Sequence, residues 1–220
     1  MITFLIPTYN ELSNIELIVN KINNLYLNES YKIFFIDDDS KDGSLKIFSK
    51  LKNNYDNIDY HIRKSSSRDL TQSIIHALKY IDSEYIMVID CDLQHDVNAI
   101  PMMINALIYQ NYDLVIGCRN INAINQLNRR YISIFGILLT KLTGIPKLKD
   151  PLSGFFGLKT IDFKNVSSHI KSRGYKILLS IIFYLSKDIK FKEIDINFYE
   201  RQNEQSKLYL KVKFYFLMQI

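Results

Sequence analysis

Two carboxylates placed two residues apart are the sharpest candidate for chemistry in the sequence. Asp90 and Asp92 follow the apolar run Tyr85–Ile89, and Gln94 comes two residues later. In an extended chain, residues two apart share a face, so these side chains could offer oxygen atoms to one cation. Mg²⁺ and Mn²⁺ prefer such ligands and usually complete their shell with water and substrate phosphate. The alternative is a plain surface turn, but the position directly after a buried strand favours the metal site.

Polar residues also follow two other apolar runs. Tyr9, Asn10 and Glu11 come after Ile2–Pro7, and a run of three aspartates, Asp37 to Asp39, comes after Tyr31–Ile36. In an open parallel sheet, ligands bind beyond the carboxyl ends of the strands. Three polar clusters at such ends therefore predict a binding site along one edge of a sheet.

The segment from Asp38 to Gly43 resembles the start of a calcium-binding EF-hand loop. Its twelfth position is Ser49 rather than the glutamate that such loops require, and a strand precedes it. We expect a turn in which Gly43 has positive φ and Asp42 or Ser40 caps the next helix. A hydrogen bond from Asp38 to a nucleotide is the second possibility.

Several common catalytic motifs are absent. No G-x-G-x-x-G follows the first strand and no G-x-x-x-x-G-K-[ST] occurs, which disfavours a dinucleotide site and a P-loop. None of the four histidines forms H-x-x-x-H, so a zinc hydrolase is disfavoured as well. Ser153 and Gly154 do not belong to a G-x-S-x-G nucleophile elbow.

Length and composition describe one ordinary folded domain. The chain has 220 residues, 47% of them hydrophobic, which is enough for a sizeable core. Two cysteines exclude a disulfide scaffold, no apolar run reaches the ~20 residues of a membrane span, and the N-terminus lacks the basic start of a signal peptide. We therefore expect a protein that is not secreted. The net charge of +5 permits an acidic partner surface without requiring one.

The order of apolar runs predicts the fold class. Short continuous runs, typical of buried strands, alternate with segments of helical periodicity in the first 116 residues. Strands are expected at 2–7, 31–36, 58–62, 85–89 and 114–116, and helices at 14–25, 44–51, 70–81 and 98–109. A short segment at 154–158 and a late strand at 189–198 follow. This alternation implies a mostly parallel sheet covered by helices on both faces.

Eight motifs in order carry a resemblance to a known family. They are PTYNE with Asn14, IDDDSKDGS, RDLTQSIIHAL, IDCDLQHD, IGCRN, DPLSGFFGLK, GYKILL and RQNEQSKL, starting at residues 7, 36, 68, 89, 116, 150, 174 and 201. The chain resembles family 2 glycosyltransferases of GT-A fold, and within them the dolichyl-phosphate mannosyltransferase group of polyprenyl-phosphate glycosyltransferases. The resemblance implies an α/β, Rossmann-like sheet in a single domain, with residues 1–120 binding the nucleotide sugar and 121–220 facing acceptor and membrane.

The resemblance also implies roles for individual residues. The nucleoside part of a nucleotide sugar would be held by Pro7, Tyr9, Glu11, Ile36 and Asp38. The diphosphate would meet Asp90, Cys91, Asp92 and Gln94, with Asp90, Asp92 and Gln94 as ligands of Mg²⁺ or Mn²⁺. The donor or acceptor phosphates would meet Arg119, Arg201 and Lys207, and Asp92 and Arg119 would be catalytic. The chain departs from the family pattern at Cys91, Asp39 and Lys41, where Ala, Asn or Gly, and Pro are usual.

The implied reaction is inverting transfer of a sugar, with GDP-mannose favoured as donor, to a polyprenyl (dolichyl or undecaprenyl) phosphate. A phosphate acceptor is already ionised near neutral pH, so it needs no general base. The alternative is a UDP-sugar donor, carrying glucose or GlcNAc, with a lipid phosphate or a glycan hydroxyl as acceptor. A hydroxyl would need a late base, for which Asp150 and Glu193 are the candidates. A binding module for nucleic acid is disfavoured, because acids rather than basic clusters gather at the strand ends.

Two late segments are apolar on nearly every side, namely 129–142 and 174–185, and lysines mix with aromatic residues from Lys207 onwards. Both apolar segments are too short to span a bilayer, but they could lie in its interface. The alternative is that they simply cover the sheet. We expect peripheral attachment to the cytoplasmic face of a membrane, and a membrane-anchoring partner subunit is compatible with it.

Overall fold

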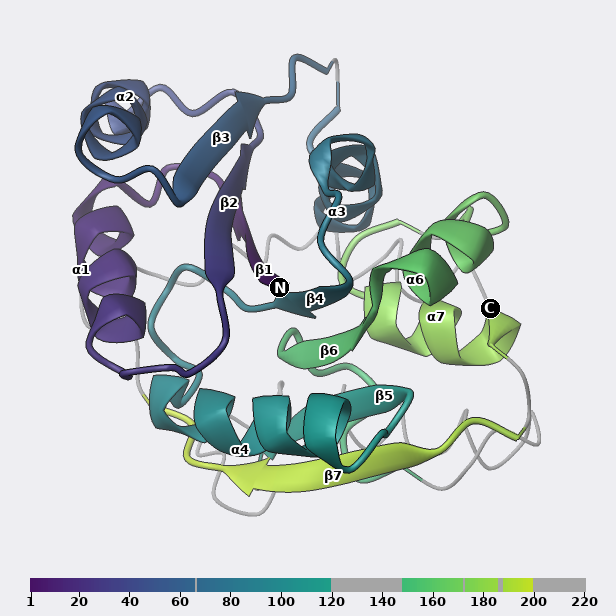
Figure 1. Cartoon of the computed structure of the whole chain (residues 1–220). Coiled ribbons are helices and arrows are strands. Elements are labelled where there is room, and N and C mark those ends of the chain that lie inside the picture. The colour runs from purple at the N-terminus through teal and green to yellow at the C-terminus, as the bar shows by residue number, and fades with distance from the viewer. Residues whose placement is uncertain (66, 120–147, 172, 186–187, 200–220) are drawn as a thin grey trace.

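A seven-stranded sheet with helices on both faces forms the described part of the chain (Figure 1). The computed structural model describes residues 1–65, 67–119, 148–171, 173–185 and 188–199. The strands are β1 (Ile2–Thr8), β2 (Tyr31–Asp37), β3 (Ile58–Ile62), β4 (Tyr85–Val88), β5 (Leu114–Arg119), β6 (Phe156–Lys159) and β7 (Phe191–Ile196). The helices are α1 (Leu12–Asn23), α2 (Ser44–Asn54), α3 (Leu70–Ala77), α4 (Ile100–Ile104), α6 (Thr160–Ser167) and α7 (Ile177–Tyr184).

The strand order is β3-β2-β1-β4-β6-β5-β7. The pairs β1–β2, β1–β4, β2–β3 and β5–β7 are parallel, as the alternation of strands and helices predicts. Strand β6 is antiparallel to both β4 and β5. The loop before β6 therefore lies at the same edge of the sheet as the carboxyl ends of β4 and β5, and it adds residues 148–155 to that edge.

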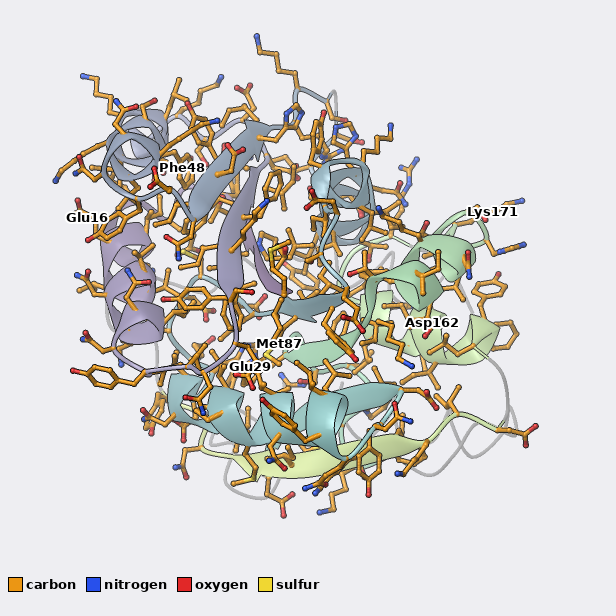
Figure 2. All side chains as sticks on the ribbon, in the orientation of Figure 1. Glu16, Glu29, Phe48, Met87, Asp162 and Lys171 are labelled. Carbon is orange, nitrogen blue, oxygen red and sulfur yellow. The ribbon has the colours of Figure 1, made fainter. Side chains whose placement is uncertain are left out.

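Two hydrophobic cores lie on opposite faces of the sheet, which explains the continuous apolar strands. Helices α1, α2 and α4 cover one face, where Phe4 and Phe35 pack with residues such as Phe48 and Met103. Helices α3, α6 and α7 cover the other face, where Leu5 packs with residues of those helices. Figure 2 shows Phe48 and Met87 in the interior, whereas the exposed Lys171 extends outward. The prediction of helices on both faces is confirmed.

Two predicted helices differ in detail. The segment predicted at 98–109 is divided into a 3₁₀ turn at Val97–Ala99, helix α4, and a π-helical turn at Asn105–Tyr109. The segment predicted at 70–81 ends its α-helical part at Ala77 and tightens into a 3₁₀ turn at Leu78–Tyr80. Helical periodicity identifies the buried face, but it does not distinguish these hydrogen-bond patterns.

The apolar segment at 174–185 covers the sheet with one face only. Ile177, Leu178 and Ile181 of α7 are buried in the second core, whereas Phe183 and Tyr184 are 57% and 44% exposed. The segments at 129–142 and from Lys207 lie outside the described residues. Among the helices of the described ranges, none has the length and apolarity needed to cross a membrane.

Candidate active site

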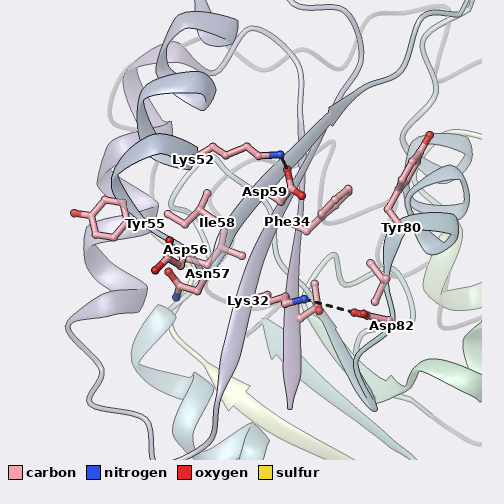
Figure 3. A pocket seen from close by; sticks show the side chains of 13 residues that line it. Lys32, Phe34, Lys52, Tyr55, Asp56, Asn57, Ile58, Asp59, Tyr80 and Asp82 are labelled. Atoms are coloured by element: carbon pink, nitrogen blue, oxygen red, sulfur yellow. Dashed lines mark hydrogen bonds and ion pairs between the residues drawn. The ribbon is translucent and has the colours of Figure 1, made fainter.

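The carboxyl edge of the sheet gathers the loops after β1, β2 and β4, the end of β5, and the loop that leads into β6. Each of the first three loops contains a non-glycine residue with positive φ: Asn10 (51°), Asp39 (59°) and Leu93 (60°). Such sparsely populated conformations persist only where surrounding contacts enforce them, and they cluster at functional sites. By contrast, a pocket lined by Lys32, Tyr55, Asp59 and Tyr80 (Figure 3) includes residues at the amino ends of β1, β2 and β3, away from these loops.

The loop after β4 holds the predicted metal ligands in a turn. Strand β4 ends at Val88, and Cys91 and Asp92 form a turn, so strand alternation does not align the two carboxylates. Asp92 is 8% exposed and its Oδ1 accepts a hydrogen bond from the Gln94 backbone N–H (3.1 Å). Asp90 lies against Gly154, where an added Cβ would stand 2.7 Å from Asp90 Oδ2. The loop before β6 therefore restricts where the Asp90 carboxylate can point.

The same loop is fastened to the chain after β7. Gln94 Nε2 donates to the Tyr199 carbonyl (3.0 Å), and the Tyr199 N–H donates to the Gln94 carbonyl (2.8 Å). His95 forms an antiparallel bridge with Phe198. Because the amide nitrogen of Gln94 is bound to Tyr199, its oxygen is the atom suited to a cation.

The donor set fits a hard divalent cation that takes few ligands from the protein. No cluster of three or more His, Cys, Asp or Glu side chains suited to a metal is found in the described ranges. The loop instead offers two carboxylates and one amide. Mg²⁺ and Mn²⁺ bound with a nucleotide commonly use one or two carboxylates and take their remaining ligands from water and phosphate.

Arg119, at the end of β5, is a fixed cation beside this loop. It donates from Nε to Asp150 Oδ2 (2.6 Å) and from Nη2 to Oδ1 (2.7 Å), and its backbone N–H also donates to Asp150. Burial opposes the charge on Arg119, but the hydrogen bonds and charge of Asp150, together with the charge of Asp90, raise the pKa of Arg119. Asp150 is fully buried. Asp150 is bound through Nε and Nη2 of Arg119 and not through Nη1. The Nη1 end of the guanidinium can therefore face a phosphate.

The two candidate bases for a hydroxyl acceptor are both committed to local contacts. Asp150 is bound by Arg119, and Glu193 Oε1 accepts hydrogen bonds from the Lys149 N–H (2.6 Å) and the Cys118 thiol (3.2 Å). Burial raises the pKa of the Cys118 thiol, which keeps it protonated as a donor. Asp150 is therefore buried and paired, whereas Glu193 is half-buried and uses one oxygen to hold Lys149 and Cys118.

His95 is buried beneath the same loop. Its ring is stacked on Phe155 at 5.4 Å between centroids, and its Nε2 lies 3.8 Å from Asp90 Oδ2. Burial, which outweighs the attraction of Asp92, lowers the pKa of His95 to about 4. The imidazole is therefore neutral near pH 7 and packs beside Asp90.

The predicted nucleoside residues lie at the ends of β1 and β2. Pro7 and Ile36 are partners in the register of these strands and both are buried, so they can shape the site from below. Glu11 is 7% exposed, and its Oε2 accepts a hydrogen bond from Asn14 Nδ2 (2.7 Å). The Tyr9 ring is covered by the Arg68 guanidinium at 4.0 Å.

Asp38 is held by a network that the sequence did not reveal. Arg63 binds both of its carboxylate oxygens (2.6 and 2.8 Å), and the Ser73 hydroxyl and the Asp69 N–H donate to it as well. Asp69 in turn caps α3 through the Gln72 N–H and accepts from the Gly174 N–H (2.9 Å). These partners are 25 or more residues away from Asp38, and no local motif marks them.

The EF-hand-like segment is a turn, as predicted. Gly43 has φ of 98°, and Asp42 accepts hydrogen bonds from the backbone N–H groups of Ser44 and Leu12. Ser40 accepts from the Asn10 N–H (2.7 Å), which ties the loops after β1 and β2 together. Cys91 is buried in the core, whereas Arg201 and Lys207 lie outside the described residues.

The architecture matches a solved glycosyltransferase structure. Glucosyl-3-phosphoglycerate synthase from Mycobacterium tuberculosis, in complex with Mn²⁺, UDP and glucosyl-3-phosphoglycerate, superposes with a TM-score of 0.72 at 15% identity over 93% of this chain and 73% of that one. At this identity the likeness shows the fold. The class is therefore the predicted GT-A fold, a mixed α/β sheet with helices on both faces.

The sequence gives the family. The model for glycosyl transferase family 2 matches residues 3–180, and the chain belongs to that family. The dolichol-phosphate mannosyltransferase of Pyrococcus furiosus is 32% identical over the whole chain, which spans 62% of that protein's length. The dolichol-phosphate mannosyltransferases of Mycosarcoma maydis and Saccharomyces cerevisiae are 29% and 26% identical over 98% of the chain, which spans 76% and 84% of their lengths.

Proposed function

We propose that this protein is an inverting glycosyltransferase that moves mannose from GDP-mannose to a polyprenyl phosphate, with Mg²⁺ or Mn²⁺ as cofactor. One observation carries the proposal: the loop that contains Asp90 and Asp92 lies beside Arg119, and the buried Asp150 keeps the Arg119 guanidinium protonated and in place. Carboxylates for a cation next to a guanidinium for phosphate suit a diphosphate leaving group. The names of the relatives in three organisms support the choice of acceptor and sugar.

The residues of the loop after β4, together with Arg119, each have a role in this proposal. Asp90, Asp92 and the Gln94 oxygen hold the cation, which when bound stabilises charge on the departing diphosphate. Arg119, oriented by Asp150, binds a phosphate oxygen through the outer end of its guanidinium. The acceptor phosphate attacks as an anion, so no proton has to be removed. The commitment of Asp150 and Glu193 to other partners favours such an acceptor over a glycan hydroxyl.

A UDP-sugar is the second candidate donor, because solved structures of the same fold contain UDP or UDP-glucose. Glucose or GlcNAc would then be transferred. Donor identity would be decided by contacts to the base and the sugar. The nucleoside is expected near Tyr9, whose ring the Arg68 guanidinium covers.

A donor panel tests the proposal. The purified protein is incubated with Mn²⁺, a short polyprenyl phosphate, and GDP-mannose, UDP-glucose or UDP-GlcNAc in turn. We expect glycolipid with GDP-mannose, its loss in excess EDTA, and its loss in Asp92→Ala, which should keep the circular dichroism of the parent. Asp82→Ala, an acid at the opposite edge, is the matched control and should remain active. Absence of product with every donor would refute the function, and full activity in EDTA would refute the metal.

A further inference from the structure

The ring of Phe198 contacts two residues of the candidate active site, each of which also has another partner. The Arg119 guanidinium lies 5.4 Å from the centroid of this ring, and the His95 ring lies 5.7 Å away at an angle of 54°. Arg119 is meanwhile bound by Asp150, and His95 is stacked on Phe155. Phe198 therefore joins a cation at the end of β5 to an imidazole in the loop after β4.

The backbone holds this ring in place. Phe198 forms the bridge with His95, the neighbouring Tyr199 exchanges two hydrogen bonds with Gln94, and Asn197 Nδ2 donates to Asp96 Oδ2 (3.1 Å). Three consecutive residues after β7 are thus fastened to three consecutive residues of the loop. A side chain anchored in this way loses little entropy when it positions a neighbour.

Phe198 constrains a motion that Asp150 does not. The bidentate pair fixes two nitrogens of Arg119 against the carboxylate, but the guanidinium can still tilt about the line that joins those two nitrogens. A ring beside the guanidinium restricts that tilt, and the attraction between the cation and the ring adds to the restriction. The same ring supports His95, whose Nε2 is 3.8 Å from Asp90.

We propose that Phe198 is a positioning residue for the transfer reaction, which orients Arg119 and supports the Asp90 loop without touching the substrate itself. The inference rests on the proposed function, since it assigns the orientation of a phosphate-binding arginine. An aromatic ring at position 198 is required, and apolar bulk does not replace it.

Three variants separate these requirements. Phe198→Leu keeps the apolar volume but removes the ring, and we expect kcat to fall about tenfold while KM for the nucleotide sugar stays within about twofold. Phe198→Trp keeps a ring and should restore kcat to within about threefold of the parent. Tyr109→Leu, at a side chain that is 65% exposed, is the control for loss of an aromatic residue and should leave kcat unchanged. A Leu variant as active as the parent, or a Trp variant as slow as Leu, would overturn the proposal.

A second readout does not depend on turnover. The chain contains no tryptophan, so the indole of Phe198→Trp can be excited selectively at a wavelength that the 15 tyrosines do not absorb. Adding Arg119→Met to that variant should shift its emission, because the guanidinium lies against the ring. Adding Lys50→Met instead is the control and should leave the emission unchanged, because Lys50 belongs to an exposed ion pair with Glu16 elsewhere in the chain. Equal spectra would refute the contact itself. If no donor is turned over but the shift is present, the proposed function fails while the contact stands.

Discussion

Gly154 is the residue that brings the loop before β6 against the proposed metal site. A Cβ built there would approach all three carboxylate atoms of Asp90, at 2.7, 3.1 and 3.2 Å. A carboxylate at the end of a side chain can rotate away from such a contact at low energetic cost. Glycine at this position therefore determines where Asp90 points more than it determines stability.

Gly154→Ala should consequently impair function more than folding. We expect the Mn²⁺ concentration for half-maximal activity to rise at least tenfold, and the free energy of unfolding to change by less than about 1 kcal/mol. Gly157→Ala is the matched control, because its Cβ would meet the flexible ends of Leu107 and Met87 at 3.3 Å each, and the Ile86 carbonyl at an ordinary contact distance of 3.5 Å. Activity against Mn²⁺ concentration and thermal melting of both variants provide the measurement. Indistinguishable Mn²⁺ requirements would contradict the role given to Gly154.

The sequence predicted which residues at the strand ends belong to the candidate site, but not the side chains that hydrogen-bond to them. Asp38 and Asp90 are conspicuous because each follows an apolar run. Arg63 and Asp150, which hold Asp38 and Arg119, stand 25 and 31 residues away along the chain, and no local pattern pairs them with these partners. The extended chain assumed from Asp90 to Asp92 was wrong, and the turn that the sequence offered as the alternative is present there, because the periodicity of a strand does not reveal where the strand ends.

At the scale of elements, α7 has two distinct faces. Its buried face holds Ile177, Leu178, Ile181 and Ile182, and its outer face holds Phe183 and Tyr184. The loops next to it include the exposed Lys171 and Arg173. Aromatic residues beside basic ones suit an anionic membrane surface, so we propose that this face contributes to peripheral attachment.

Replacing both aromatic residues by serine tests that proposal. Phe183→Ser with Tyr184→Ser should weaken co-sedimentation with anionic vesicles several-fold at low salt, with little change in melting temperature, because the buried face is untouched. Tyr26→Ser with Tyr109→Ser, at positions 92% and 65% exposed, removes two exposed aromatic rings elsewhere and should bind as the parent does. Undiminished binding of the α7 variant would exclude this face.

The periodicity of apolar residues predicted most of the helices and strands, but it did not predict the direction of β6. Continuous apolar runs identify buried strands on either side of position 120, including the segment that forms β6. The orientation of β6 depends on the path of the chain between β5 and β6, which no local pattern encodes. The antiparallel pairing of β6 with β4 and β5 therefore could not be predicted from the sequence.

For the whole molecule, the candidate site joins loops that belong to separate parts of the chain. Residues 8–11, 37–43, 90–96, 119 and 148–155 all reach the same edge. A ligand that contacts several of these loops binds only the folded chain, and it must therefore stabilise the fold.

Mn²⁺ and GDP together, each at about 100 times its dissociation constant, should raise the free energy of unfolding by at least about 2.7 kcal/mol, and the melting temperature by several degrees. EDTA should abolish the part of the increase in melting temperature that depends on the cation. The Asp92→Ala variant should lack that part as well. Differential scanning fluorimetry measures it. A shift unaffected by EDTA would mean that the nucleotide binds without the metal.

The antiparallel strand has a consequence for the order of folding during synthesis. Strand β4 pairs with β1 and β6, and β5 pairs with β6 and β7, so β5 joins the sheet through a strand made later than itself. Until residues 156–159 leave the ribosome, β4 presents an apolar open edge, which is prone to pair with other chains. The arrival of β6 closes that edge and brings Gly154 to Asp90. In the nascent chain, the pairing that covers this apolar edge therefore also completes the proposed metal site.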